Sequence, residues 1–414
     1  MLRMSRVASK MHRALILLSI SGLLAYAMAA SVPVAPFSFG SSGADAAKWD
    51  KLMKYKLWAE GSGRNTPAIT FESDVHITDT VGFVGSPKGG LQFINDQHSL
   101  GGPLLFAGNF TNANGRDTIM TGPFRFATFT IADNSRHSNY FYGPYCVTSM
   151  SSHISLNHGN AVDSCAIVPP VDSDLSLPTV NNHTDSISLG NVNHNGTGND
   201  RYIHVPPGST VYDVGMSSLT LANEANLYVA MPPGGRPTRI FISGNVSLSS
   251  KTSFKVIYAK NESQWSKSSK TWSVSASDAA KNSEYNGDLL VYFKNGVSFP
   301  AGDNRIMQGT LITSSDIRIQ QHMSFAGQLI AKSIYINSDF KADQFRYVPF
   351  DPPVINSTAL ASGSLHEGKT GETLNVQLDK APSVPVTIKY CIAFDASANV
   401  NQGKTGTYHQ SSNW

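Results

Sequence analysis

Apolar and polar residues alternate in short runs through most of the chain, and residues 309–319 and 327–336 are near-copies of each other. Each copy consists of two apolar runs with a polar break between them. The apolar residues that correspond are Leu311 and Leu329, Ile317 and Ile334, and Ile319 and Ile336. This pattern predicts a right-handed parallel β-helix (solenoid), because equivalent residues of successive coils stack inward along its axis. An irregular β-sandwich is the alternative.

Similar runs extend the prediction over most of the chain. From residue 69 to 131 strand-like runs are separated by glycine-containing turns, and Pro349, Pro352 and Pro353 end the pattern. We therefore predict an all-β protein with a β-helical domain at residues 69–350. Residues 30–68 are expected to form a linker and a short helix over 45–60, where apolar residues recur at helical spacing.

The first 29 residues resemble a secretory signal peptide. Basic residues precede an apolar run from Ala14 to Ala25, and Ala27-Met28-Ala29 is the small-x-small pattern that signal peptidase accepts. The apolar run is too short to cross a hydrocarbon core of roughly 30 Å. We expect a secreted or cell-surface protein with no membrane span in the mature chain. An uncleaved N-terminal anchor is the alternative.

The composition is typical of an extracellular β-rich protein. Charged residues make up 15 % of the chain, against roughly 25 % in an average globular protein. The net charge of +3 includes four basic residues of the signal segment, which leaves −1 for the rest. A nearly neutral chain offers no basic surface for nucleic acid, so we expect no nucleic-acid partner.

Residues 133–200 are rich in Asn, Ser, His and Pro and have little periodicity. We predict that they form a loop-rich insertion that projects from the β-helix. Cys146 and Cys165 are expected to form a disulfide in an oxidising compartment. By restricting the unfolded chain, it would stabilise the fold by about 3 kcal/mol. Two unpaired buried thiols are the alternative. Cys391 is either a buried strand residue or has its partner beyond Trp414.

Two polar segments carry aromatic residues that do not fit a core pattern. Tyr140 and Tyr142 come shortly before Cys146, and Trp265 and Trp272 lie in a Ser- and Lys-rich stretch. Exposed rings can stack on sugar faces or pack against a partner protein. We predict these four as ligand-binding residues for a polysaccharide or a cell-surface component. Packing of the rings onto the solenoid is the alternative.

The segment 364–390 alternates apolar and polar residues in two strands joined by a turn that contains Pro382. With Glu367-Gly368 at its start and a Val-Thr-Ile-Lys-Tyr strand at 386–390, it resembles the opening of a Calx-beta domain. The resemblance implies a partial immunoglobulin-like β-sandwich at 351–414 and places Glu367 and Asp395 at positions of Ca²⁺ ligands. Calcium takes six to eight oxygens, and the later acidic positions of the family are missing here. A solvated loop Glu is the alternative, and we expect no other cofactor.

Residues 70–355 also resemble the exported β-helical segments of bacterial surface proteins, which are often joined to sandwich modules. That resemblance rests on the Gly-x-Leu-Ile coil starts, the proline-rich exit and the paired cysteines. It covers most of the chain and implies a bacterial, non-enzymatic adhesion or structural protein.

We find no clear catalytic motif in the sequence. The histidines are scattered without metal-ligand spacing, and neither a Gly-x-Ser-x-Gly elbow nor a P-loop is present. The acidic pairs Asp172 with Asp174 and Asp339 with Asp343 carry no signal that would make them an acid and a base. We therefore predict a non-enzymatic scaffold. A carbohydrate-binding or polysaccharide-cleaving β-helix protein is the alternative.

Overall fold

The structure is a computed structural model of the 414-residue chain. The described residues are 48–49, 51–77, 82–113, 117–132, 139–150, 162–177, 180, 185–195, 200–208, 210–281, 287–302, 305–320, 323–337, 340–341, 355–360 and 374–378. The chain divides into two units, residues 34–351 and residues 1–33 with 352–414. In the described part of the second unit, β32 (Ile355–Leu360) pairs antiparallel with β33 (Leu374–Leu378).

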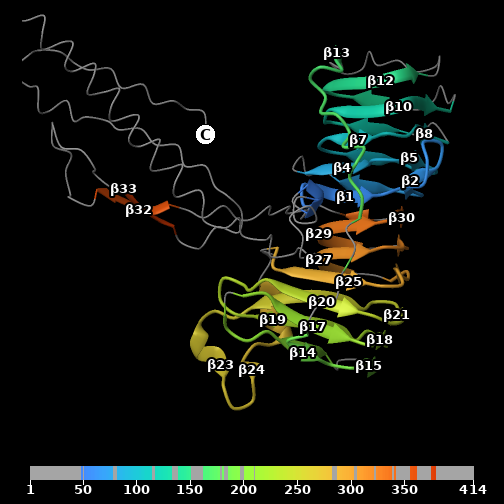
Figure 1. Ribbon diagram of the computed structural model, residues 1–414. Coiled ribbons are helices and arrows are strands. Elements are labelled where there is room, and N and C mark those ends of the chain that lie inside the picture. Colours follow the sequence, from blue (N-terminus) through green and yellow to red (C-terminus); the bar gives the residue numbers. More distant parts are fainter. Residues whose placement is uncertain are drawn as a thin grey trace, which may run out of the picture. The chain divides into compact units, whose positions relative to one another are not determined.

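The unit 34–351 is a parallel β-solenoid with three faces, A, B and C (Figure 1). Face A consists of β1 (Tyr55–Ala59), β4 (Phe83–Ser86), β7 (Leu104–Phe106), the first halves of β10 (Phe124–Ile131) and β12 (Pro144–Met150), β13 (Val162–Asp163), β14 (Ile187–Ser188), β17 (Tyr212–Met216), β20 (Thr238–Ile242), β25 (Leu289–Phe293) and the second halves of β27 (Arg305–Thr313) and β29 (Met323–Ala331).

Face B consists of β2 (Pro67–Phe71), β5 (Gly90–Phe93), β8 (Phe110–Asn112), the second halves of β10 and β12, β15 (Asn191–Asn195), β18 (Ser218–Ala222), β21 (Val246–Leu248), β26 (Val297–Phe299), β28 (Asp316–Ile319) and β30 (Ser333–Ile336). Face C consists of β3 (Val75–Ile77), β6 (His98–Leu100), β9 (Thr118–Met120), β11 (Asn139–Phe141), β16 (Arg201–His204), β19 (Asn226–Met231), β22 (Ser253–Tyr258), the first halves of β27 and β29, and β31 (Phe340–Lys341).

The segment between β22 and β25 lies outside the three faces. It contains the 3-10 turn η2 (Glu262–Gln264), the antiparallel pair β23 (Trp265–Ser266) and β24 (Thr271–Trp272), and the helix α3 (Ala276–Lys281).

The near-repeat of the sequence is one coil-to-coil step of this solenoid. The pairs in register are Leu311 with Leu329, Ile317 with Ile334, and Ile319 with Ile336. All six side chains are buried in one continuous apolar core. Full burial of one such side chain contributes roughly 1.5–3 kcal/mol, so stacked ladders of them hold the coils together. The predicted parallel solenoid is confirmed for this unit, and the sandwich alternative is wrong there.

The glycine that opens each copy of the repeat is a corner residue. Gly309 and Gly327 lie in register where the chain turns from face C to face A, with φ angles of +131° and +145°. A Cβ atom on Gly327 would lie 2.0 Å from the carbonyl oxygen of Gly309. No side chain fits in that space, and glycine adopts a positive φ without the strain other residues would meet. The corner therefore requires glycine in both coils.

The order of the coils in space differs from their order in the chain. The first coil, β1 to β3, lies between the second coil, β4 to β6, and the last one, β29 to β31. In Figure 1 the blue N-terminal coils accordingly stack on the orange coils, with teal coils at one end and green coils at the other. The solenoid is thus two half-stacks that meet at a seam between β1 and β29.

Backbone and side-chain hydrogen bonds join the seam. Leu57 of β1 lies in register with both Leu329 of β29 and Val84 of β4. The buried amide of Gln328 donates from Nε2 to the carbonyl oxygens of Met53 and Tyr55, at 2.7 and 2.9 Å. Its Oε1 atom accepts a hydrogen bond of 3.0 Å from the Thr310 hydroxyl. One side chain therefore satisfies two carbonyls that lie more than 270 positions earlier in the chain.

The predicted helix over 45–60 is wrong in its second half. Helical backbone is described only at 48–49 and 51–52, and Tyr55–Ala59 forms β1. Neighbouring apolar residues of this strand point to opposite sides. Leu57 lies in the main core, and Trp58 lies in a separate apolar cluster outside face A. The solenoid consequently begins at β1, earlier than the predicted boundary at residue 69.

The predicted insertion at 133–200 is also wrong. β11 and β12 continue the upper stack by pairing with β9 and β10, and β14 to β16 form the coil at the other end. Between them the described residues 164–177 and 180 lie over face A, and we call this segment the strap. It lacks strand periodicity because it crosses the strands instead of joining them. The predicted Cys146–Cys165 disulfide is confirmed, with an S–S distance of 2.02 Å.

The Calx-beta prediction falls largely outside the described residues. β33 coincides with the predicted strand at Leu374, Val376 and Leu378. The predicted Val386–Tyr390 strand and Cys391 lie outside the described residues, as do Glu367 and Asp395. The immunoglobulin-like sandwich and its Ca²⁺ ligands stay predictions.

We predict that Leu329→Asp destabilises the protein by several kcal/mol, because it buries a carboxylate without a partner in the core beside the seam. Ser298→Asp is the matched control, since Ser298 is exposed on β26 and its replacement is expected to change stability by about 0.5 kcal/mol or less. Urea unfolding followed by circular dichroism measures both. Equal effects of the two substitutions would contradict the solenoid core.

We predict that Gln328→Ala lowers the free energy of unfolding by about 2–4 kcal/mol, because it leaves two buried carbonyl groups without their donor. Gln92→Ala removes the same side chain from a half-exposed position of face B, so its effect should stay near zero. Thermal unfolding of both variants tests this. A Gln328→Ala protein as stable as Gln92→Ala would mean that the seam does not depend on this amide.

Candidate functional site

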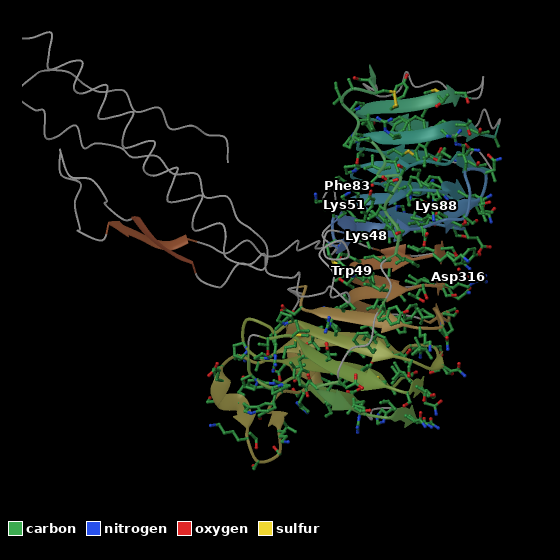
Figure 2. All side chains as sticks on the ribbon, in the orientation of Figure 1. Lys48, Trp49, Lys51, Phe83, Lys88 and Asp316 are labelled. Atoms are coloured by element: carbon green, nitrogen blue, oxygen red, sulfur yellow. A yellow bond between two sulfur atoms is a disulfide. The ribbon has the colours of Figure 1, made fainter. Side chains whose placement is uncertain are left out.

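The outer side of face A is covered by other parts of the chain. Its outward residues form an apolar cluster with the N-terminal helical turn and the strap. The buried members are Trp49, Leu52, Met53, Tyr55, Trp58, Leu175, Phe241, Leu290, Ile312 and Ile330. Figure 2 shows Trp49, Lys51 and Phe83 on this side, opposite Lys88 and Asp316. Face A is therefore an internal interface, with no free surface for a ligand along this cluster.

Covalent and polar contacts fix the strap to face A (Figure 1). The disulfide joins Cys165 of the strap to Cys146 of β12. The guanidinium of Arg125 on β10 donates from Nη2 to the carbonyl oxygens of Cys165 and Val168, at 3.1 and 2.8 Å, and from Nε to that of Pro169, at 3.0 Å. Farther along, Asp172 forms an ion pair of 2.6 Å with Lys51, which is partly exposed and adds little stability by itself.

Part of face C is covered by the segment that contains β23 and β24. Trp272 is only 3 % exposed and donates from its indole Nε1 to the carbonyl oxygen of Val205 at 2.6 Å. The backbone N–H of Trp272 donates to Nδ1 of His204 at 3.0 Å, and α3 lies against β22. This segment is a cover packed on β19 and β22.

The predicted aromatic ligand site is not supported by the placement of its residues. Trp265 packs against Trp272, with ring centroids 5.0 Å apart, and both belong to the apolar cluster of the cover. Removing the buried Trp272 should therefore destabilise the protein. Trp272 packs onto the solenoid beside Val205 and His204, and the half-exposed Trp265 packs on Trp272.

The two tyrosines lie elsewhere on the solenoid. Tyr140 is half-buried on β11, and Tyr142, just after β11, is 42 % exposed. Eight strand spacings separate β11 from β19 along face C, or roughly 38 Å. The four predicted aromatic residues do not form one site.

Face B carries a row of outward polar side chains at successive coils. Seven members lie in register on both sides of the seam: Ser298, Arg318, Tyr335, Thr70, Gln92, Thr111 and Thr130. Asn193, Thr220 and Ser247 form a second part of the row at the green end of the stack. We call these ten residues the polar row. All of them are exposed or half-exposed, in contrast to the buried cluster outside face A.

The polar row is rich in hydrogen-bonding groups and poor in charge. It contains hydroxyl and amide side chains, one phenol and a single ion, the guanidinium of Arg318. That guanidinium lies over the Tyr335 ring, 6.0 Å from the centroid. The seven members from Ser298 to Thr130 extend over six strand spacings, or roughly 29 Å. The geometry offers a long flat surface for a ligand that is itself extended.

The sequence carries part of the signal for this row. The runs Ile69-Thr70-Phe71 and Leu91-Gln92-Phe93 each place one polar residue between two core residues. The alternation alone identifies Thr70 and Gln92 as outward. Their place in one row follows only from knowing that their strands are neighbours, which the structure supplies.

Carboxylates and histidines give little support to a catalytic or metal centre. No group of three or more His, Cys, Asp or Glu side chains suited to a metal ion occurs among the described residues. Asp172 is paired with Lys51, Asp174 lies on the same strap, and Asp339 and Asp343 are outside the described residues. Within the same part of the chain no helix is long and apolar enough to cross a membrane.

Two histidines are held neutral by burial. Burial lowers the pKa of His98, which lies in the core with its ring 4.2 Å from that of Phe93, to about 4. Burial also lowers the pKa of His204, whose Nδ1 accepts the hydrogen bond from the Trp272 backbone. Both residues are on strands and contribute to packing, so neither is a loop histidine available to a ligand.

We predict that His98 makes stability depend on pH. The folded pKa of His98, about 4, is below the ordinary histidine value of 6.5, so between these pH values the unfolded chain takes up a proton that the folded chain does not. Stability should therefore be full above pH 6.5 and fall by roughly 3 kcal/mol as the pH drops to 4. Denaturant titrations across this range should show that His98→Phe removes most of this slope, while His76→Gln on β3 keeps it. An unchanged slope in His98→Phe would contradict the assignment.

Comparison of the chain with known protein families, with curated proteins and with solved structures found no match. A function therefore has to be inferred from what the chain's own surfaces can bind. Of the surfaces described above, the polar row of face B is the longest that remains accessible.

Proposed function

We propose that the protein is a non-enzymatic, exported scaffold of the cell surface or extracellular matrix, which adheres to a surface component through face B. The observation that carries this proposal is the polar row, a long accessible array of hydrogen-bonding side chains on a rigid solenoid. An adhesion surface gains from rigidity, because little side-chain and backbone freedom is lost on binding.

The arrangement of the other faces supports the same function. The strap and the Trp265–Trp272 cover occupy face A and part of face C, and they use the apolar and aromatic residues that could otherwise bind a partner. Those segments stabilise the scaffold. Face B is left with its polar side chains directed outward.

Export is supported by two independent features. The N-terminal segment has the pattern of a signal peptide, and the Cys146–Cys165 disulfide is of the kind that persists in oxidising compartments. The Calx-beta resemblance and a bacterial origin remain part of the proposal.

The competing function is cleavage of a polysaccharide by a β-helix enzyme. Glycoside cleavage needs two carboxyl groups on opposite sides of the scissile bond, whereas the polar row contains none. Its one ion, Arg318, can orient a ligand but cannot act as a general base, because a guanidinium stays protonated.

We predict that the labelled mature protein binds to intact cells of the organism that makes it and releases no reducing or unsaturated sugar ends from polysaccharides. Thr111→Arg puts a long charged side chain into the row and should lower retention about tenfold, which corresponds to roughly 1.4 kcal/mol. Ser324→Arg, at an exposed position of face C, is the matched control and should bind like the wild type.

Cell retention measured by fluorescence, together with a sugar-end assay, tests this function. Equal retention of both variants would remove face B from the proposal. Sugar-end release that is lost on mutating one acidic residue would establish the enzyme instead.

A further inference from the structure

The centre of the polar row is built from both half-stacks of the chain. Tyr335 of β30 and Thr70 of β2 are in register across the seam, and Gln92 of β5 continues the row on the other side of Thr70. Arg318 precedes Tyr335 and Thr111 follows Gln92. Five adjacent coils thus present a guanidinium, a phenol, a hydroxyl, an amide and a second hydroxyl in line.

The hydrogen-bonding groups of this row are not used by the protein. In the part of the chain that the structure describes, no hydrogen bond involves the side chains of Thr70, Gln92, Thr111, Thr130 or Tyr335. Polar side chains beside the row behave differently. Ser333 donates to Asp316 at 2.7 Å, and Asn109 donates to Asn65 at 3.1 Å. The flanking groups are satisfied by each other, while those of the row are left to solvent or a ligand.

The charge of the row restricts what can bind there. A phosphate-rich or sulfated polymer needs several cations, and the row has only Arg318. An apolar partner would leave the row's hydroxyl and amide groups without hydrogen bonds, which is unfavourable once they are desolvated. The chemistry that fits is a neutral, extended molecule covered with hydroxyl or acetamido groups, whose apolar ring faces can contact Tyr335.

We infer that the polar row of face B binds a neutral polysaccharide chain that lies along the solenoid axis, with Tyr335, Thr70 and Gln92 at its centre. This inference rests on the proposed adhesion function and names its ligand class. The strand spacing of about 4.8 Å places one donor or acceptor opposite each successive sugar unit. Sugar hydroxyls accept from Gln92 and Arg318, and they exchange hydrogen bonds with the hydroxyls of Thr70 and Thr111.

The experiment measures retention of the purified mature protein on insoluble cellulose, chitin and β-1,3-glucan, with polygalacturonate as the acidic polymer. The test variant carries Thr70→Ala, Gln92→Ala and Tyr335→Ala. The matched control carries Ser99→Ala, Ser324→Ala and Tyr202→Ala, which are half-exposed or exposed positions on face C. Thermal unfolding of both triple variants checks folding, and Thr111→Arg provides a second probe of the row if the first variant is unstable.

The expected result is retention on at least one neutral polymer, at least tenfold weaker in the test variant and unchanged in the control. Competition by soluble oligosaccharides of that polymer should release the protein, and high salt should not. Retention only on polygalacturonate, equal loss in test and control variants, or no retention on any neutral polymer would overturn the inference. Where cells still retain the protein through face B but no neutral polymer does, the adhesion function stands and the ligand class is wrong. Loss of both would refute both.

Discussion

The fold depends on the pairing of its first coil with its last. β1 has a parallel partner on each side, β4 from the next coil and β29 from near the end of the unit. Without that second partner each half-stack would end in an open strand edge and an exposed slice of core, which favours aggregation. Gln328 reinforces the pairing because its side-chain amide donates hydrogen bonds to the carbonyl oxygens of Met53 and Tyr55. These contacts join residues far apart in the chain. The chain therefore loses conformational entropy in closing a long loop before the contacts can stabilise the fold.

The strap follows from that order of coils. A chain that begins in the middle of the stack and builds toward one end has to return to the other end before it can build back to the seam. The return lies over face A, so the outward residues there are apolar, among them Leu290, Ile312 and Ile330. Arg125 and the disulfide fix its start near β10 and β12. The path of the strap thus decides which face is covered, and it leaves face B with accessible polar side chains.

The sequence predicted the local structure well and the long-range order poorly. The alternation around Leu311, Ile317 and Ile319 identified the coil and its inward residues. The same alternation does not say which coil lies next to which, so it cannot distinguish the strap from an insertion. The exposure predicted for Trp272 is wrong for a related reason. The Ser- and Lys-rich neighbours of Trp272 predict an exposed side chain. In the fold, the two-residue strand β24 packs on face C and buries the indole among residues that are distant in the sequence.

The placement of the polar row links binding to the seam. Tyr335 and Thr70 come from opposite half-stacks and become neighbours only when β30 pairs with β2. A ligand that contacts both residues binds the folded state and not the separated halves, so by mass action its binding free energy adds to the stability of the seam. An adhesion protein under load gains from this arrangement, since the contact that holds the ligand also opposes separation of the two half-stacks. A row confined to one half-stack would bind the same ligand without that coupling.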